Sequence, residues 1–122
     1  MTKRILVVED QVDNRQILRD LLTSADYEMT EAENGEEALA AVAKQRPDLI
    51  LMDIQLPIMD GYEATRRIKA NPAWKDIPII VVTSYALSGD EAKARNAGCD
   101  AYVTKPYSPR ALLAKIREFI PK

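Results

Sequence analysis

The sequence contains a single cysteine, Cys99, among its 122 residues. One cysteine can form neither an internal disulfide nor a metal cage built from several thiolates. We therefore expect Cys99 to be a small buried apolar side chain at the start of a strand. A chain of this length needs no such staple, because it can bury roughly two-thirds of the surface that it exposes when unfolded.

An excess of basic residues is also missing. Seventeen lysines and arginines stand against nineteen aspartates and glutamates, which gives a net charge of −2. Proteins that bind nucleic acid or an anionic membrane generally carry a clustered basic excess. We therefore expect no nucleic acid and no membrane among the partners of this protein.

Long apolar runs are absent as well. A membrane-spanning helix needs about 18 to 20 apolar residues, whereas the apolar run near the start of the chain, Ile5–Val8, stops at Glu9. This run is also too short for the apolar region of a signal peptide. We expect a cytoplasmic protein that forms one domain over residues 1–122, with no output domain.

Short apolar runs alternate with segments of helical periodicity. The clearest runs are Ile5–Val8, Leu49–Met52 and Ile79–Val82, and weaker ones lie at Tyr27–Ala32 and Ala101–Thr104. Continuous hydrophobicity over so few residues is typical of strands that are buried on both faces, as in a parallel sheet. The sequence therefore predicts five strands of this kind.

The intervening segments show the apolar spacing of amphipathic helices. The predicted inward-facing stripes are Ile17, Leu18, Leu21 and Leu22; Ala38, Leu39 and Val42; and Leu112, Leu113, Ile116 and Ile120. The predicted helix ends are marked by Asn34 with Glu37, Ser88 with Glu91, Ser108 with Pro109, Gly98 and Pro121. The helix at about 87–97 is weaker than the others, because its inward positions are mostly alanine. Alternation of strands and helices predicts an α/β fold, a doubly wound five-stranded parallel sheet of the (βα)5 type.

Polar side chains follow four of the predicted strands at the point where each strand ends. They are Glu9, Asp10, Asp53, Thr83 and Lys105. Parallel strands joined by helices all point the same way, so their carboxyl ends lie along one edge of the sheet. Open sheets of this kind bind their ligands at that edge. We therefore expect these five side chains to meet in one site.

The chemistry of this set favours a divalent cation and a phosphoryl group. If all are ionised, the three carboxylates and Lys105 sum to −2 (−3 plus +1), and such crowding raises the pKa of at least one acid. One Mg²⁺ would offset this charge and keep coordination positions for a phosphoryl oxygen. Lys105 would supply a point charge and Thr83 a hydroxyl donor. Asp53, on the central predicted strand, is the natural nucleophile.

Each of these residues taken singly has an ordinary explanation. Acid pairs after strands often cap helices, and a lone threonine or lysine is most often a surface residue. A joint arrangement at the ends of four strands is far harder to reach by accident. The set as a whole, and not any one member, therefore carries the functional prediction.

The motifs of the chain resemble those of a known family, the receiver domain of two-component response regulators in the CheY-like superfamily. The matching segments are Val8-Glu9-Asp10, the block from Pro47-Asp48 to Asp60-Gly61, Val82-Thr83-Ser84, and Tyr102-Val103-Thr104-Lys105-Pro106. The similarity covers essentially the whole chain and points to the single-domain members. The segment Asp53-Ile54-Gln55-Leu56-Pro57 leans towards the DivK-like group. The resemblance implies a flavodoxin-like, CheY-like sheet with the strand order 2-1-3-4-5.

The resemblance also implies roles for the acidic residues. Asp53 would accept a phosphoryl group from a phosphohistidine on a partner. Asp10 and Asp53 would bind Mg²⁺ directly, with the backbone carbonyl of Gln55 as a third ligand, and Mn²⁺ can take the place of Mg²⁺. Glu9 would act mostly through water, because glutamate is longer than the aspartate that often occupies this position in the family.

A switch is implied by the same resemblance. Lys105 would pair with the phosphoryl group and form a cis peptide bond with Pro106, while Thr83 would move towards the phosphate and Tyr102 would turn inward. Phosphorylation adds about −1.5 to −2 charge and three acceptor oxygens, which biases an existing equilibrium between two conformations. The readout surface would combine the helix at 87–97, the strand at 101–104 and the final helix.

The resemblance further implies partners and a lifetime for the signal. Gln55 and Tyr85 would flank the acyl phosphate and influence attack by water. The expected partners are a histidine kinase or a histidine phosphotransfer protein, and a downstream protein target. We expect a phosphoacceptor switch with self-catalysed phosphoryl uptake and loss, not an enzyme with a separate substrate. We expect a monomer, with dimerisation through the readout surface as the alternative.

Three other functions share parts of this pattern. A haloacid-dehalogenase-like phosphatase places a general acid two residues after its aspartyl nucleophile, where this chain has Gln55. A flavodoxin-type nucleotide module needs a phosphate loop rich in Ser, Thr and Gly after the first strand, where Glu9-Asp10 would repel a phosphate. A receiver-like adaptor that is never phosphorylated usually lacks part of the set.

Overall fold

The computed structural model describes residues 2–83 and 90–121, within which five strands alternate with five helices. In chain order they are β1 (Arg4–Val8), α1 (Val12–Ser24), β2 (Glu28–Ala32), α2 (Gly35–Lys44), β3 (Leu49–Met52), α3 (Gly61–Ala70), β4 (Ile79–Thr83), α4 (Asp90–Ala97), β5 (Ala101–Thr104) and α5 (Pro109–Phe119). The predicted alternation of short strands and helices is confirmed.

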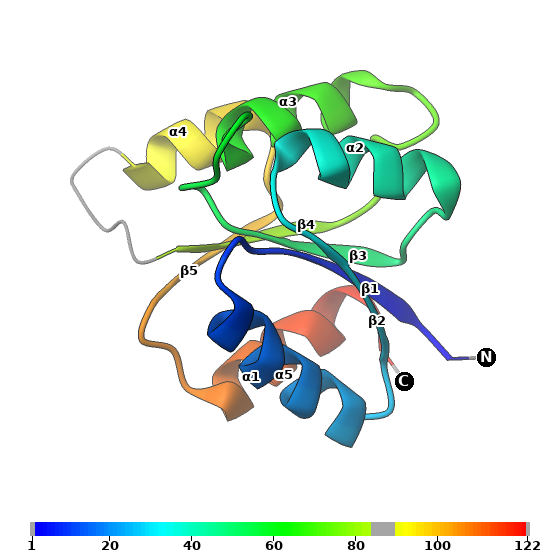
Figure 1. Ribbon diagram of the computed structural model, residues 1–122, viewed down its shortest axis with the longest axis vertical. Helices are drawn as coiled ribbons and strands as arrows, with labels where there is room; N and C mark the ends of the chain where they lie inside the picture. Colours follow the sequence, from blue (N-terminus) through cyan, green and yellow to red (C-terminus); the bar gives the residue numbers. More distant parts are fainter. Residues whose placement is uncertain (1, 84–89, 122) are drawn as a thin grey trace.

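The strands form one parallel sheet in the order β2-β1-β3-β4-β5. Figure 1 shows α1 and α5 against one face of this sheet and α2, α3 and α4 against the other. The doubly wound α/β class is therefore confirmed, as is the strand order that the resemblance implied. All five carboxyl ends lie along the same edge, because every strand runs in the same direction.

Alternate residues of the central strands contribute to two separate hydrophobic cores. In β3, Leu49 and Leu51 pack in the core that includes residues of α1 and α5, whereas Ile50 and Met52 pack in the core that includes residues of α2 and α3. Each of these four side chains is at most 1% exposed. The run is continuously apolar because a polar residue at any of its positions would enter one core or the other.

Two of the predicted helix caps are present. The Asn34 side chain accepts a hydrogen bond from the backbone N–H of Glu37 at 2.8 Å, at the start of α2. The hydroxyl of Ser108 accepts one from the backbone N–H of Ala111 at 3.3 Å, at the start of α5. These bonds satisfy N–H groups that have no partner within the helix.

Helix α4 buries little apolar surface, as its alanine-rich sequence predicts. Its buried side chains are Ala94 and Ala97. Gly98 follows the helix with a φ of +108°, the left-handed conformation that commonly ends helices. The predicted beginning of this helix, with the capping box at Ser88, lies outside the described residues. The described part of α4 is therefore weakly held compared with α1 or α5.

The prediction for Ile17 is wrong. The apolar pattern places Ile17 on the buried stripe of α1, but its side chain is 57% exposed. Leu18 and Leu22 are buried and lie about one turn apart, so they set the direction that faces the sheet. Ile17 is rotated about 100° from Leu18 around the helix axis and therefore points away from the core.

The structure bears on two features noted in the sequence, the single cysteine and the lack of long apolar runs. Cys99 is a free, buried thiol just before β5, and burial raises its pKa. It packs in a hydrophobic core as expected. Within the described part of the chain, none of the helices has both the length and the apolar character that crossing a membrane requires.

Gly61, at the start of α3, has no room for a side chain. A Cβ there would lie 2.0 Å from the carbonyl oxygen of Asp53, and the Gly61 N–H donates to the Ile54 carbonyl at 2.9 Å. We predict that Gly61→Ala lowers the free energy of unfolding by about 2–4 kcal/mol, as measured by urea denaturation. Ala70→Gly, at the exposed end of the same helix, is the control and should cost at most about 1 kcal/mol. Equal losses in the two variants would contradict the steric explanation.

Candidate functional site

Backbone hydrogen bonds that continue the sheet place the predicted site residues side by side. The Asp53 N–H donates to the Val8 carbonyl at 3.0 Å, directly before Glu9. The Lys105 N–H donates to the Thr83 carbonyl at 2.8 Å. These bonds join the end of β1 to that of β3, and the end of β4 to that of β5, at the carboxyl edge of the sheet.

The structure brings the three predicted carboxylates and the predicted lysine together. Oxygens of Glu9, Asp10 and Asp53 lie within 4.8 Å of one another. The Lys105 Nζ lies 2.8 Å from Oε1 of Glu9 and 3.5 Å from Oδ2 of Asp53. The side chains of Lys105 and Asp53 are 21% and 12% exposed, so the site is a shallow recess and not an open surface.

Both oxygens of the Glu9 carboxylate are already engaged. Oε1 accepts from Lys105, and Oε2 accepts from the backbone N–H of Gln11 at 3.1 Å. Glu9 is also buried, whereas Asp10 and Asp53 are partly exposed. Asp53 also has a contact at each oxygen, since its Oδ1 accepts from the Ile54 N–H at 2.7 Å and its Oδ2 lies 3.5 Å from Lys105. Asp10 and Asp53 are nevertheless less buried than Glu9 and so are more open to a metal ion, while Glu9 holds the lysine in place.

Arg15 supports this acidic loop and was missed by the sequence analysis. Its Nη1 donates to the backbone carbonyl of Glu9 at 2.8 Å, and its Nε donates to Glu31 of β2 at 3.0 Å. Arg19 forms an ion pair with the same glutamate. The sequence could have indicated this role, because two arginines on α1 face acids on the neighbouring edge strand.

Burial and mutual repulsion govern the ionisation of the site. Burial raises the pKa of Asp53 to about 6; Lys105 opposes this rise, and Glu9 adds to it. The pKa of Asp10 is also raised, first by burial and then by Glu9. Burial likewise favours a higher pKa for Glu9, but Lys105 and the Gln11 N–H outweigh it and the pKa is lowered. The pKa values of two of the acids are therefore raised, as expected, but burial contributes more to each rise than the neighbouring acids do.

Thr83 and Tyr102 lie on the same face of the sheet. Thr83 is fully buried at the end of β4. Tyr102 pairs in register with Val81, two residues before Thr83, and packs as a half-buried side chain against the core that includes residues of α2 and α3. A movement of the Thr83 side chain would therefore take place close to the space that Tyr102 borders.

The remaining predicted residues lie in loops around the recess. Gln55 follows Asp53 in the loop before α3 and is exposed. The peptide bond between Lys105 and Pro106 is cis, as the resemblance implied. Tyr85 lies outside the described residues, so its role stays a prediction.

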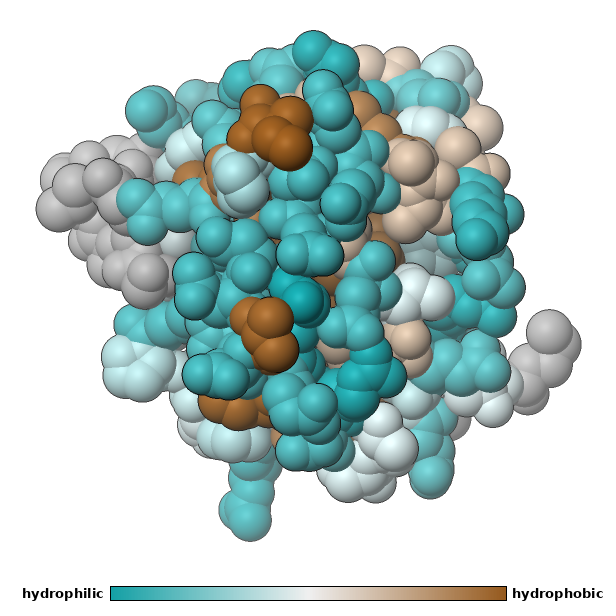
Figure 2. Space-filling model, viewed as in Figure 1, coloured by the Kyte–Doolittle hydropathy of each residue, from teal (hydrophilic) through white to brown (hydrophobic). Residues whose placement is uncertain are grey.

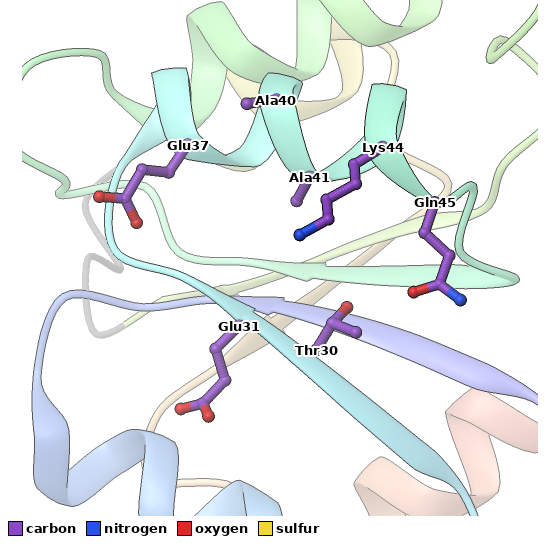
Figure 3. A pocket seen from close by; sticks show the side chains of 7 residues that line it. All are labelled: Thr30, Glu31, Glu37, Ala40, Ala41, Lys44 and Gln45. Carbon is purple, nitrogen blue, oxygen red and sulfur yellow. The ribbon is translucent and has the colours of Figure 1, made fainter.

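Two hollows differ in their relation to this site. One of about 280 Å³ lies beside it, between α1 and the loop that precedes α5. It is lined by Glu9, Asn14, Ile17, Leu18, Lys105, Pro106, Tyr107 and Pro109. A larger one of about 350 Å³ lies between β2 and α2 (Figure 3) and contains none of the predicted site residues. The predicted site residues therefore border the smaller of these two hollows.

The donor set fits a hard divalent cation. Oxygen ligands from two partly exposed carboxylates, with space for water, are what Mg²⁺ prefers in proteins. The three carboxylates exceed the Lys105 ammonium in charge, and their oxygens lie close enough to share one ion. Among the described residues, the arrangement can hold a dication and still present Asp53 to a ligand.

Comparisons with known proteins agree with this geometry. The model of the response regulator receiver domain matches residues 5–117. Among curated proteins, the polar-differentiation response regulator DivK of Brucella anthropi is 42% identical over 120 residues, which cover 98% of each chain.

Solved structures are similar over the whole chain. A putative response regulator from Chloroflexus aurantiacus superposes with a TM-score of 0.94 at 30% identity, covering 100% of both chains. The receiver domain of a sensor histidine kinase from Pseudomonas aeruginosa has a TM-score of 0.92 at 36% identity, again with 100% of both chains covered. The latter structure has a magnesium ion coordinated in its active-site cleft.

The raised pKa of Asp53 predicts that its charge destabilises the metal-free fold at neutral pH. The pKa of this carboxyl is about 6 in the folded state and 3.8 ordinarily. The stability of the fold therefore falls as the pH rises from about 4 to 7, because the folded state resists loss of this proton. We predict that Asp53→Asn in EDTA raises the free energy of unfolding by about 1–3 kcal/mol at pH 7.5 and changes it little at pH 4. Urea unfolding at both pH values checks this, and a gain as large at pH 4 as at pH 7.5 would contradict it.

Proposed function

The chain belongs to the response regulator receiver domain family, and from that premise we propose that Asp53 accepts a phosphoryl group from a phosphohistidine on a partner protein. The protein is a CheY-like response regulator of signal transduction that is similar to DivK. A phosphorelay role fits this family and the chemistry of the site. The proposal assigns the individual steps of that role to residues of this chain.

The observation that carries the proposal is the position of the Asp53 carboxylate beside an ammonium and two further acids. In the transfer, a carboxylate oxygen of Asp53 attacks phosphorus, and the phosphorus–nitrogen bond of the donor breaks. The imidazole nitrogen leaves with the electron pair of that bond. Lys105, whose Nζ is 3.5 Å from Asp53, would pair with a phosphoryl oxygen as negative charge builds up there.

Three groups of this chain would hold the metal that the reaction needs. Asp10 and Asp53 would bind Mg²⁺ or Mn²⁺ through carboxylate oxygens, and the backbone carbonyl of Gln55 would be the third ligand. Glu9 would act through water, since its own oxygens already accept from Lys105 and Gln11. The dication supplies positive charge that offsets the phosphoryl oxygens next to a carboxylate.

Phosphorylation would be read out on the face formed by α4, β5 and α5. A phosphoryl group on Asp53 offers new acceptor oxygens, which favour the conformation in which the Thr83 hydroxyl lies closer. Tyr102, on the same sheet face, would then turn inward. Helix α4 would shift readily, because the side chains that its described residues bury, Ala94 and Ala97, are small.

The partners follow from this chemistry. A histidine kinase or a histidine phosphotransfer protein would donate the phosphoryl group, and a downstream protein would bind the altered face. Gln55 and Tyr85 would set the lifetime of the acyl phosphate through their effect on attacking water. Loss of the phosphoryl group would be self-catalysed, and we propose a monomer that works in the cytoplasm.

Removal of the Asp53 carboxylate should abolish phosphorylation. We predict that acetyl phosphate and Mg²⁺ give one phosphoryl adduct per chain, seen by intact-protein mass spectrometry, and that Asp53→Asn gives none. Asp60→Asn is the matched control, because it makes the same chemical change at the N-cap of α3, where asparagine also caps well. A full adduct on Asp53→Asn would move the nucleophile to another residue.

Replacement of the lysine should separate metal binding from signalling. Lys105→Arg should bind Mg²⁺ within about threefold of the original affinity but fail to transmit phosphorylation, because the wider guanidinium misplaces its charge. Amide NMR shifts of β5 on phosphorylation measure the response, and Lys75→Arg in an exposed loop is the control. The same shifts in Lys105→Arg and in the unaltered chain would refute this role.

A further inference from the structure

Ile58 lies in the loop between Asp53 and α3 and adopts a conformation that isoleucine rarely takes. Its φ is +69°, in the left-handed region. Branching at Cβ makes this region costly for isoleucine, while glycine, asparagine and aspartate occupy it more readily. The side chain is 75% exposed, so packing within the fold does not offset the cost.

Backbone hydrogen bonds hold the loop in this turn. The Met59 N–H donates to the Pro57 carbonyl at 2.7 Å, which closes a three-residue turn around Ile58. The Gly35 N–H, at the start of α2, donates to the Met59 carbonyl at 2.9 Å. A Cβ on Gly35 would meet that same oxygen at 2.6 Å. The loop is packed closely against α2 and has little freedom to relax.

The stability of the fold therefore does not explain an isoleucine at this position. Asparagine or glycine would fit the turn with less strain, and the change would remove no buried contact. Strained residues near a reactive group are commonly retained for their part in function. We therefore infer that the apolar side chain of Ile58 has its role in contact with another molecule.

The other large apolar side chains that the described residues expose lie near the same site. They are Val12, which is 67% exposed, and Ile17, which is 57% exposed. Val12 begins α1 two residues after Asp10, and Ile17 lines the hollow beside Glu9 and Lys105. Figure 2 shows isolated apolar areas on a face of the molecule that is otherwise largely hydrophilic.

Ile58, Val12 and Ile17 form an apolar rim around the recess, and a phosphohistidine-bearing protein is the binding partner that this rim fits. The Asp53 side chain is only 12% exposed, and transfer requires phosphorus to approach its oxygen to bonding distance. A protein donor must therefore cover the rim of the recess, whereas acetyl phosphate can enter without touching it. We propose that Ile58 is a specificity-determining contact for the protein that donates the phosphoryl group, an inference that rests on the proposed function.

The test compares a protein donor with a small one. Ile58→Asn removes the apolar side chain but keeps a residue that tolerates left-handed backbone, and Ile58→Leu keeps an apolar side chain. Asp26→Gly is the matched control, because Asp26 is exposed, has a φ of +66° and lies between α1 and β2, at the opposite edge of the sheet. The protein donor is an autophosphorylated histidine kinase or phosphotransfer domain, chosen because it phosphorylates the unaltered chain.

We expect Ile58→Asn to lower kcat/KM for transfer from the protein donor about five- to thirtyfold and to leave uptake from acetyl phosphate within about twofold. The same variant should raise Tm by roughly 2–6 °C, because it relieves backbone strain. Ile58→Leu should retain most of the transfer rate. Asp26→Gly should leave Tm about unchanged, because aspartate already tolerates left-handed backbone, and it should change neither reaction.

Unchanged transfer from the protein donor to Ile58→Asn would overturn the inference. An equal loss with both donors would overturn it too, because it would indicate a distorted site and not a lost contact. So would a loss in Ile58→Leu as large as that in Ile58→Asn. The proposed function fails on a different result, namely no uptake from acetyl phosphate by the unaltered chain, or an adduct that Asp53→Asn retains.

Discussion

The chemistry of the site depends on the repulsion between three carboxylates that meet beside the Lys105 ammonium. Their oxygens lie within 4.8 Å of one another, in a recess where burial raises the pKa of Asp53 to about 6. Lys105 relieves only part of this repulsion, since its shorter contact is with Glu9 and not with Asp53. A site with such unbalanced charge changes strongly in energy when a cation or a phosphoryl group arrives. That sensitivity is what a phosphorylation switch requires.

The fold keeps this repulsion in place by fixing the opposite edge of the sheet. The Lys69 ammonium donates to the Ile77 carbonyl at 2.8 Å and to the Asp100 carboxylate at 2.8 Å. The same carboxylate oxygen accepts from the Ile79 N–H at 2.8 Å. These bonds tie the end of α3, the start of β4 and the turn before β5 to one another. With that edge anchored, the rearrangement proposed above would involve the carboxyl ends of the strands and the weakly packed α4.

The sequence predicted the central strands well because β1, β3 and β4 are almost wholly buried. Leu49–Met52 and Ala101–Thr104 begin and end where the apolar runs do. The predicted start of the edge strand β2 was one residue too early, since Tyr27 packs in a core before β2 begins. Ile17 was misplaced because its spacing fits the stripe but Leu18 and Leu22 set the direction of the helix. Periodicity gives a face only to within about 100° when apolar residues are adjacent.

The chemistry of the site could be predicted from residue types, but its internal contacts could not. Strand topology alone brings Glu9, Asp53 and Lys105 to one edge. The sequence does not reveal that the Glu9 carboxylate accepts hydrogen bonds from Lys105 and Gln11, because this depends on how far each side chain reaches. The left-handed backbone of Ile58 was equally hidden, because no glycine or asparagine marks it and the hydrogen bond to the Met59 carbonyl comes from Gly35 of a distant helix.

The most direct test of the account is a high-resolution crystal structure of the protein phosphorylated by acetyl phosphate in the presence of Mg²⁺. The account requires phosphorus on a carboxylate oxygen of Asp53, the ion on Asp10 and Asp53, and the Lys105 ammonium within hydrogen-bond distance of a phosphoryl oxygen. Phosphorus on another residue, or an ion bound away from these carboxylates, would contradict it.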